Sequence, residues 1–366
     1  MSPAMQPPSD QLKRGWTTGA CATAATRAAF TALLTGEFPD PVEIVLPKGQ
    51  TPSFALAVEG KGEGWAQAGI VKDAGDDPDV THGALILSTV RRGAPGSGVR
   101  FFAGEGVGTV TLPGLPIAPG EPAINPVPRA MMVEAIETLA ETHGEPGDVE
   151  IEISVPEGAE LALKTWNPRL GIKGGLSILG TTGIVNPFSC SAWIHSIHRG
   201  IDVARAQGRA HVAGATGSTS EATVQALYDL PEEAMLDMGD FAGGMLKYLR
   251  KNPVPKVTVA GGFAKMTKLG QGFLDLHSGR SQVDFNWLAD KLEKVTGDAA
   301  LGAKARGANT ALEVLQLAGD AGDALAKEIA AAARNTAVQT LRDAPCAIDI
   351  VVVDRQGRIL ARSADE

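Results

Sequence analysis

Short apolar runs that end in a glycine turn and lead into a helix-like segment recur in the second half of this chain. The first run, residues 176–179, enters the turn at residues 180–183, and the second, residues 210–213, enters the turn at residues 214–221. A third run, residues 256–260, enters another glycine turn that carries two lysines. Strands that alternate with helices form parallel sheets, and their turns gather at the carboxyl edge. The repetition therefore predicts a Rossmann-like α/β domain with right-handed crossovers.

The glycine turns have the features of loops that bind phosphate- or nucleotide-sized ligands. Glycine lets the backbone come close to a ligand, and the start of a helix offers free N–H groups. The glycine spacing does not match the full dinucleotide fingerprint, so an ordinary tight turn between strand and helix is the alternative. Two successive turns at one sheet edge favour the ligand-binding interpretation.

The first half of the chain shows a different pattern, in which short β-type runs outnumber helices. An alanine-rich helix is expected to begin after Thr17 or Thr18, either of which can cap it, and to end near Gly36. A second helix is expected at residues 128–143, among strands that continue to residue 155. We therefore expect a flexible tail at residues 1–14, an α+β N-terminal domain at residues 15–168 and a Rossmann-like α/β C-terminal domain at residues 169–366.

The end of the chain is expected to be mostly scaffold. Three alanine-rich helices are predicted at residues 286–294, 299–318 and 323–341, followed by a β-hairpin at residues 347–361.

The segment at residues 72–83, KDAGDDPDVTHG, concentrates charge in a loop that follows a predicted strand. Its carboxylates can bind a cation, act as bases or hold polar groups of a substrate. The spacing does not match an EF-hand loop, so calcium is not predicted. A solvated acidic turn is the alternative.

A histidine pair, His195 and His198, falls on the predicted helix at residues 189–207. Histidines three residues apart can ligate a metal, but no third ligand is evident nearby. No metal site is therefore predicted.

Composition narrows the classes of function. The formal net charge of −9 argues against a nucleic-acid-binding protein, so any anionic ligand must be held by local basic residues. Three scattered cysteines without a CxxC motif indicate a reducing compartment. No apolar run is long enough to span a bilayer, and the N-terminus lacks the apolar core of a signal peptide. The cytoplasm is the expected location.

Several long blocks together are far more specific than any single glycine turn. They read GWTTGACATAA at residues 15–25, KDAGDDPDVTHGA at 72–84, GEGVGTVTLPGLPIAPGEPAINPVPRAM at 104–131, TWNPRLGIKGGLSILGTTGIVNPFS at 165–189 and GGFAKMTKLGQGFLDLHS at 261–278. In sequence and order they resemble the CbiD family, the cobalt-precorrin-5B C(1)-methyltransferases of the cobalt-early, anaerobic cobalamin pathway. Trp16 departs from the smaller aromatic residue expected there.

The resemblance implies methyl transfer from S-adenosylmethionine to carbon C-1 of a ring-contracted, cobalt-bearing tetrapyrrole, giving cobalt-precorrin-6A and S-adenosylhomocysteine. Cobalt would arrive as part of the substrate. The glycine turns suit the nucleotide part of the donor, and a cleft between two domains with local lysines and arginines suits a large acidic acceptor. The residues expected to hold the donor are Gly180, Thr181, Thr182, Gly183, Gly214, Thr216, Gly217 and Ser218.

The expected mechanism is direct in-line transfer, in which the enzyme aligns the reactants and excludes water. A proton must be managed on the macrocycle, so a base is plausible without being required before the methyl group moves. The candidate catalytic residues are Asp73, Asp76, Asp77 and His82. The residues expected to hold the acceptor are Thr17, Thr18, Lys72, Arg169, Lys173, Lys265 and Lys268.

Two other functions are compatible with the loops taken alone. A nucleotide-dependent oxidoreductase could bind NADP at the same glycine turns, and a non-catalytic tetrapyrrole carrier would need only the loops of the first domain. The combination of blocks favours the methyltransferase. The expected partner is a tetrapyrrole substrate, with no nucleic acid, no membrane and possible homo-oligomers.

Overall fold

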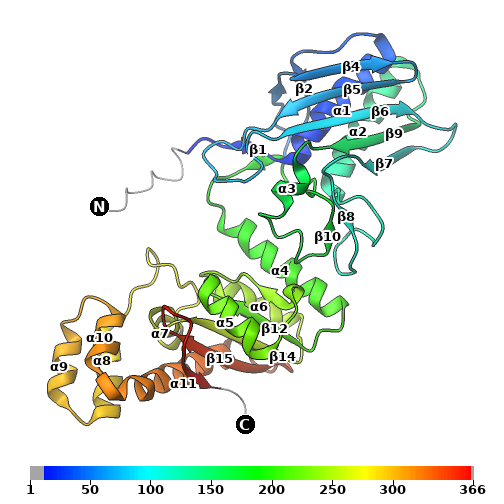
Figure 1. Ribbon diagram of the computed structural model, residues 1–366. Coiled ribbons are helices and arrows are strands. Elements are labelled where there is room, and N and C mark those ends of the chain that lie inside the picture. The colour runs from blue at the N-terminus through cyan, green and yellow to red at the C-terminus, as the bar shows by residue number, and fades with distance from the viewer. Residues whose placement is uncertain (1–11, 364–366) are drawn as a thin grey trace. The chain divides into compact units, whose positions relative to one another are not determined.

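The computed structural model describes residues 12–363 of the chain. Its internal contacts divide the chain into an N-terminal unit, Met1–Ser189, and a C-terminal unit, Cys190–Glu366 (Figure 1). The boundary expected at residues 168/169 falls inside the N-terminal unit, because the segment after it pairs with earlier strands, Ile172 with Val110 and Ile184 with Trp16. Residues 1–11 of the expected tail lie outside the described residues.

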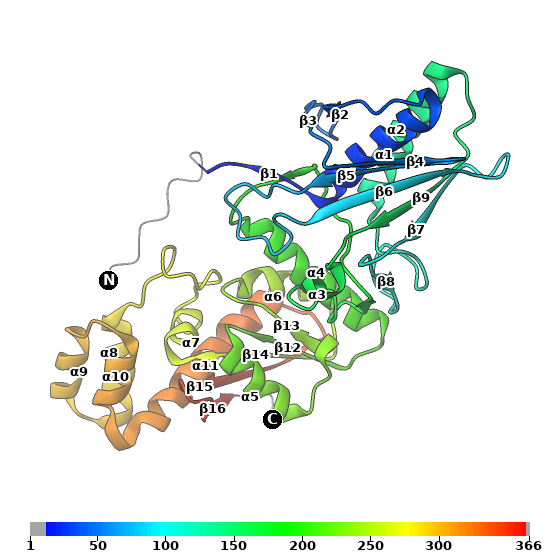
Figure 2. The ribbon, with the colours of Figure 1, turned by 45° about the horizontal axis from the view of Figure 1, so that its top comes forward.

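The N-terminal unit is built on a five-stranded sheet in the order β4-β5-β6-β9-β7. Neighbouring strands are antiparallel except β7 and β9, which are parallel. Helices α1 and α2 cover one face of this sheet (Figure 2). The elements are β1 (Gly15–Trp16), α1 (Thr18–Thr35), β2 (Val42–Glu43), β3 (Ser53–Phe54), β4 (Val58–Gly62), β5 (Trp65–Val71), β6 (Leu85–Arg92), β7 (Val99–Ala103), β8 (Thr109–Val110), α2 (Pro126–His143), β9 (Val149–Ser154), α3 (Gly158–Ala162), β10 (Ile172–Lys173) and β11 (Ile184–Val185).

The alanines of α1 explain how this helix lies close to the sheet. Ala25 and Ala28 of α1, like Ala68 of β5, are fully buried. The hydroxyls of Thr26 and Ser88, one from α1 and one from β6, share a buried hydrogen bond of 2.8 Å. Small side chains permit such close packing of helix and sheet, and the polar pair is satisfied inside it.

The C-terminal unit contains a second five-stranded sheet, in the order β13-β12-β14-β15-β16. All neighbours are parallel except β16, which is antiparallel to β15. The elements are α4 (Cys190–Ala206), β12 (His211–Ala215), α5 (Ser218–Tyr228), β13 (Met235–Leu236), α6 (Ala242–Lys251), β14 (Lys256–Gly262), α7 (Phe263–Gly270), α8 (Phe285–Thr296), α9 (Ala299–Arg306), α10 (Ala311–Leu317), α11 (Gly322–Leu341), β15 (Ala347–Val353) and β16 (Ile359–Ser363), with short 3-10 turns at Glu232–Ala234 and Gly319–Ala321.

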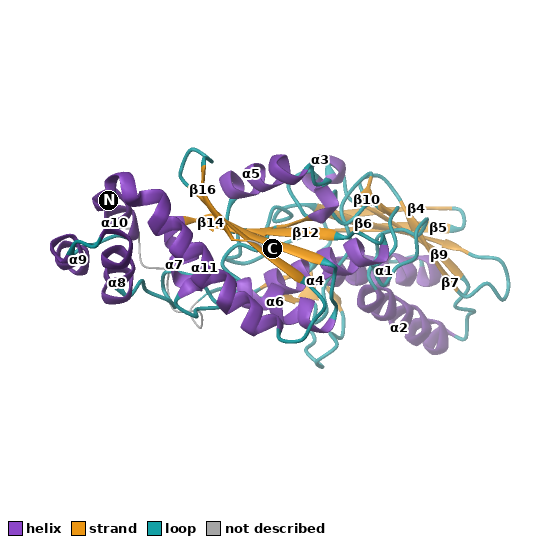
Figure 3. Cartoon of the chain, turned by 90° about the horizontal axis from the view of Figure 1, so that it is seen from below, coloured by secondary structure: helices purple, strands orange, loops and turns teal. Residues whose placement is uncertain are grey.

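Helices cover both faces of this sheet. Helix α5 packs on one face over a small cluster that includes Ala213, Val224 and Val351. The larger core lies on the opposite face, under α6, α7 and α11 (Figure 3). From β12 the chain goes to β13 on one side and then returns to β14 on the other side. The order of the sheet therefore reverses between β12 and β14.

The expected mixture of helices and strands is confirmed, but the first of the three strand-turn-helix units is wrong. Residues 176–179 form only isolated bridges, Leu176 with Val107 and Ile178 with Ile124, and these belong to the N-terminal unit. A four-residue apolar run can be buried between loops as well as in a sheet, and periodicity does not separate the two.

The predicted helix at residues 299–318 is also interrupted. Helix α9 ends at Arg306, and Thr310 then starts α10 as a cap, because its hydroxyl accepts a hydrogen bond from the N–H of Glu313. No helix among residues 12–363 combines the length and the apolar character that a membrane-spanning segment needs.

Candidate functional site

The acidic loop at residues 72–83 connects β5 and β6, two antiparallel neighbours. Its base is closed by backbone hydrogen bonds from Lys72 N–H to the Ala84 carbonyl and from Gly83 N–H to the Lys72 carbonyl. The loop is thus a long hairpin connection at the end of the N-terminal sheet.

Lys72 and Asp79 form an ion pair inside this loop. Lys72 Nζ lies 2.8 Å from Asp79 Oδ2, and the lysine side chain is only 1 % exposed. Asp79 Oδ1 accepts two more hydrogen bonds, from the N–H and the hydroxyl of Thr81. Burial raises the pKa of Asp79, but the charge of Lys72 and the bonds from Lys72 and Thr81 leave it below its ordinary value. Lys72, expected to hold the acceptor, therefore has an internal partner here, and its role toward substrate stays a prediction.

The segment before α1 lies against the same loop. The backbone N–H of Trp16 donates to the Asp73 carbonyl, and the N–H of Asp76 donates to the Lys13 carbonyl. The Cβ that an alanine would add at Gly15 would lie 2.0 Å from the backbone of Ala74, so only glycine fits this approach. Lys13, within the expected tail, is therefore part of the site.

We call the acidic loop and the segment before α1 that is hydrogen-bonded to it the N-terminal frame. Within it, the carboxylates of Asp73 and Asp76 accept hydrogen bonds. Asp73 accepts from Lys13 Nζ at 2.6 Å and from the Gly75 N–H at 2.8 Å, and these two bonds lower its pKa. Asp76 Oδ2 accepts from the backbone N–H of Lys13 at 2.6 Å. Carboxylates that accept hydrogen bonds and have a lowered pKa are weak bases, and the assignment of Asp73 as a catalytic residue stays a prediction.

His82 is held in one tautomer by the loop. The buried N–H of Ala74 donates to His82 Nδ1 at 3.0 Å. A ring nitrogen that accepts a hydrogen bond carries no proton, so the neutral ring carries its proton on Nε2. The side chain is 56 % exposed, which leaves Nε2–H able to donate to a ligand. His82 therefore offers a hydrogen-bond donor in this geometry rather than a base.

We expect the nitrogen-15 NMR spectrum of histidine-labelled protein, recorded at alkaline pH, to show the neutral His82 ring in the Nε2–H form. The His82→Gln spectrum assigns the resonance by its loss. A neutral ring protonated on Nδ1 would contradict the hydrogen bond from Ala74 and restore His82 as a candidate base.

The entrance of α1 lies against the turn at residues 180–183. The Thr17 hydroxyl caps the helix, and the Thr17 N–H donates to the Gly183 carbonyl. The Thr18 hydroxyl bonds both backbone groups of Leu179. A Cβ at Gly180 would lie 2.3 Å from the Thr17 hydroxyl. In the N-terminal unit, residues predicted to bind the methyl acceptor thus lie against the turn predicted to bind the methyl donor.

The other members of this turn differ in how exposed they are. Thr181 is exposed, while the Thr182 hydroxyl bonds the backbone of Ile184. Gly183 is buried, and a Cβ there would lie 2.4 Å from Leu46. Most of the turn is thus occupied by its own packing.

Two further predicted acceptor residues lie in the segment that precedes this turn. The Arg169 guanidinium lies 5.6 Å from the ring centre of Trp166, a cation–π contact. Lys173 is exposed on the short strand β10. The exposed amine of Lys173 can reach a solvent-borne carboxylate, and the assignments of both residues to the acceptor stay predictions.

In the C-terminal unit, the turn after β12 lies beside the end of β14. The Thr216 N–H donates to the Ala260 carbonyl, and a Cβ at Gly261 would lie 2.7 Å from the Thr216 hydroxyl. A Cβ at Gly217, in contrast, would meet no heavy atom within 4 Å, and the backbone there is extended with φ of 172°. Ser218 begins α5, so the open space lies at a helix start. Gly214 is buried against Met245 and serves the core.

Lys265 and Lys268 bind a backbone segment of their own unit. Each Nζ donates to the Leu276 carbonyl at 3.0 Å, and Lys265 also pairs with Asp240. Burial, with a smaller effect of Lys265, lowers the pKa of Lys268. Their assignment to the acceptor stays a prediction, and the local function is to fix the loop that follows α7.

The histidine pair on α4 is used in packing. His198 stacks on Tyr248 with ring centres 4.0 Å apart, and its Nε2 lies 3.3 Å from the Gly244 carbonyl. Burial lowers the pKa of both His195 and His198. Within residues 12–363, no three His, Cys, Asp or Glu side chains are grouped to hold a metal ion.

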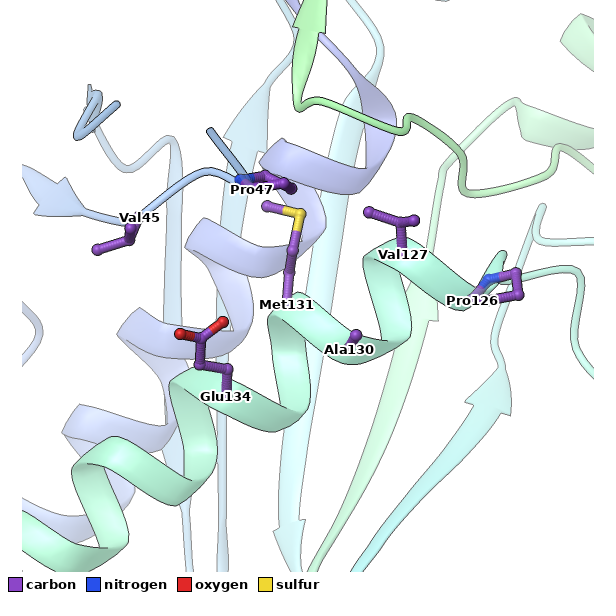
Figure 4. A pocket seen from close by; sticks show the side chains of 7 residues that line it. All are labelled: Val45, Pro47, Pro126, Val127, Ala130, Met131 and Glu134. Atoms are coloured by element: carbon purple, nitrogen blue, oxygen red, sulfur yellow. The ribbon is translucent and has the colours of Figure 1, made fainter. Parts of the chain in front are cut away.

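A groove of about 400 Å³ lies between α2 and the segment that carries Val45 and Pro47 (Figure 4). Its lining is apolar apart from one carboxylate, Glu134, and it includes none of the residues expected to bind donor or acceptor. The negative charge of Glu134 makes the groove unsuitable for an acidic ligand. The lining residues are Val45, Pro47, Pro126, Val127, Ala130, Met131 and Glu134.

Comparisons with known proteins agree with the two-part architecture. The family model described as CbiD matches residues 5–187, and the model described as the CbiD C-terminal domain matches residues 275–364. The chain belongs to the CbiD family. The end of the first match lies close to the division at Ser189.

Curated relatives match nearly the whole chain. The cobalt-precorrin-5B C(1)-methyltransferase of Brucella anthropi is 67% identical over 352 residues, 96% of each chain. The protein of the same name from Brucella abortus strain S19 is 65% identical over 356 residues, 97% of each. Among solved structures, a 1.9 Å crystal structure of the cobalamin biosynthesis protein cbiD from Archaeoglobus fulgidus is 27% identical, with a TM-score of 0.40, covering 74% of this chain and 83% of that one.

Two residues of the site are not among those predicted from the sequence. Asp79, left out of the catalytic candidates, makes the most buried ion pair of the loop. Lys13 lies within the predicted tail, yet it forms an ion pair with Asp73. The sequence shows that Asp79 shares its loop with one lysine. Only the fold shows which carboxylate of the loop pairs with that lysine.

Proposed function

We propose that this CbiD family member is a cobalt-precorrin-5B C(1)-methyltransferase that uses S-adenosylmethionine as the methyl donor. Relatives with that name match at 65–67% identity over 96–97% of the chain. Sequence identity at this level across both units supports the same reaction for this chain. The cobalt belongs to the substrate.

In the proposed reaction, carbon C-1 of the macrocycle forms a bond to the sulfonium methyl group. The carbon–sulfur bond breaks, and its electron pair stays on sulfur, which leaves as the neutral thioether of S-adenosylhomocysteine. The protein aligns the two reactants and excludes water. Because Asp73 and Asp76 accept hydrogen bonds and His82 presents a donor, we assign these residues to binding and positioning.

We place the donor at the carboxyl edge of the C-terminal sheet. This sheet is Rossmann-like in its helix-covered parallel strands, but its reversal between β12 and β14 follows the flavodoxin-like order. Ligands of open α/β sheets bind where the strand order reverses. The single observation that supports the site is the turn after β12, where Gly217 leaves open space at the start of α5 and the preceding Thr216 lies against Gly261.

The acceptor is assigned to the N-terminal unit. Thr17, Thr18 and the loop at residues 72–83 share one hydrogen-bonded frame, and Lys173 offers an exposed amine. The turn at residues 180–183, expected to bind the donor, is part of this frame.

Calorimetric titration with S-adenosylhomocysteine tests whether the methyl donor binds at the turn after β12. We expect Gly217→Val to fold normally, because the added side chain has room, and to weaken binding at least tenfold, because it fills the proposed ligand space. Thr181→Val distinguishes the two turns and is expected to bind like the wild type. Ala226→Val, at an exposed position of α5, controls for an effect on the helix itself.

Loss of binding in Thr181→Val with normal binding in Gly217→Val would move the donor to the N-terminal unit. If the wild type binds no S-adenosylhomocysteine, with cobalt-precorrin-5B absent and then present, the methyltransferase is contradicted. Retention of NADP instead would favour an oxidoreductase, and macrocycle binding alone would favour a carrier.

A further inference from the structure

Phe188 combines a strained backbone with an exposed aromatic ring. Its φ is 56°, in the left-handed region that side chains other than glycine rarely adopt. The other non-glycine residues with positive φ in the described chain, Glu157, Asp229 and Arg342, are cap residues at helix ends. Phe188 is the aromatic one among the four, and 47 % of it is exposed.

Asp77, in the acidic loop, fixes the left-handed backbone conformation of Phe188 with a hydrogen bond. Its Oδ1 accepts a hydrogen bond of 2.8 Å from the Phe188 N–H, across 111 positions of sequence. A strained residue persists only where its surroundings fix it, and such residues concentrate at functional sites. Asp77, a candidate base by sequence, thus has a specific positioning contact.

Other exposed apolar side chains belong to the same frame. Val80 lies in the acidic loop and is 40 % exposed, and Leu179, bonded to Thr18, is 47 % exposed. An aromatic ring and aliphatic side chains carried by segments that are hydrogen-bonded to one another suit a ligand with a flat apolar face and polar edges. A tetrapyrrole has this chemistry.

We propose that the Phe188 ring is a stacking surface for the macrocycle and that Asp77 is the residue that positions it. The inference rests on the proposed function and adds a specificity-determining residue to it. Stacking would cover one face of the macrocycle and orient its edge toward the donors of the acidic loop.

Three variants at one position separate the ring from the backbone. Phe188→Ala removes the ring and keeps the strain, Phe188→Gly removes the ring and relieves the strain, and Phe188→Tyr keeps both. We expect the first two to weaken cobalt-precorrin-5B binding about tenfold in an absorbance titration, and the third to stay within about threefold of wild type. The glycine variant should melt a few degrees above the alanine variant.

Asp77 supplies the matched test of positioning. Asp77→Asn keeps an acceptor oxygen for the Phe188 N–H, whereas Asp77→Ala removes it. We expect Asp77→Ala to weaken macrocycle binding about as much as Phe188→Ala, and Asp77→Asn to preserve most of both affinity and turnover. Turnover lost in Asp77→Asn with normal macrocycle affinity would instead identify a base and overturn the positioning role.

Affinity for S-adenosylhomocysteine is measured in each variant, because the proposed donor site lies in the other unit and should not change. Normal macrocycle affinity in Phe188→Ala, with normal donor binding, would overturn the stacking surface. A defect in Phe188→Gly that is absent from Phe188→Ala would show that the backbone, and not the ring, matters. Failure of the wild type to bind either ligand would contradict the proposed function itself.

Discussion

Replacing Asp79 with alanine is expected to lower the free energy of unfolding of the N-terminal unit by about 3–5 kcal/mol. The variant leaves the ammonium of Lys72 without its partner, and that side chain is 1 % exposed. It also removes the acceptor for both donors of Thr81. Urea unfolding of the full-length protein measures the change. A loss below about 1 kcal/mol would mean that Lys72 finds water or another partner.

A double variant, Lys72→Met with Asp79→Leu, provides the control. Removing both charges from a buried pair is often nearly neutral, because the desolvation cost of each ion disappears with its partner. We therefore expect the double variant to recover much of the stability that Asp79→Ala loses. Equal destabilisation of the two would show that shape, and not the unpaired charge, dominates.

The same pair makes stability depend on pH. The folded state holds the pKa of Asp79 below the ordinary value of 3.8. Its contribution is therefore fully present above about pH 4 and is lost as the pH falls through the lower folded pKa. The wild type should lose more stability than the double variant on acidification through that range. Parallel pH profiles would contradict the linkage.

Replacing Gly180 with alanine is expected to cost about 2–4 kcal/mol of unfolding free energy. The added Cβ would lie 2.3 Å from the Thr17 hydroxyl that caps α1, and the backbone φ of 133° strains any side chain. Both effects act on the frame that joins the entrance of α1 to the acidic loop. Thermal and urea unfolding measure the loss.

Gly217→Ala is the matched comparison. The added methyl group there meets no heavy atom within 4 Å, and the extended backbone accepts any residue. We expect its stability to equal or slightly exceed that of the wild type, because alanine reduces the freedom of the unfolded chain. Two glycines of equal appearance in the sequence would thus differ by several kcal/mol. Similar stability of the two variants would contradict this account.

The local pattern of the sequence predicted much of the fold. Alanine spacing and a threonine cap predicted α1, and Thr17 performs that cap. Alternation of strands and glycine turns predicted the parallel strands β12 and β14. These predictions succeed because capping, periodicity and turn chemistry act between residues close in sequence. Residues 176–179 have the same apolar pattern as a strand but do not form one. An apolar run therefore predicts that a segment is buried and does not predict that it pairs in a sheet.

By itself, the sequence determined the family, the mixed α/β architecture and the set of charged loop residues. Only the tertiary structure decided which of those residues meet: Lys72 with Asp79, Lys13 with Asp73, and Asp77 with the strained Phe188. It also assigned the turn at residues 180–183 to the N-terminal unit and the turn at residues 214–218 to the C-terminal unit, although the sequence predicted both turns for one sheet. The physical reason is that composition and spacing fix what a segment can form locally. Hydrogen-bond partners and open space depend on which distant segments the folded chain brings together.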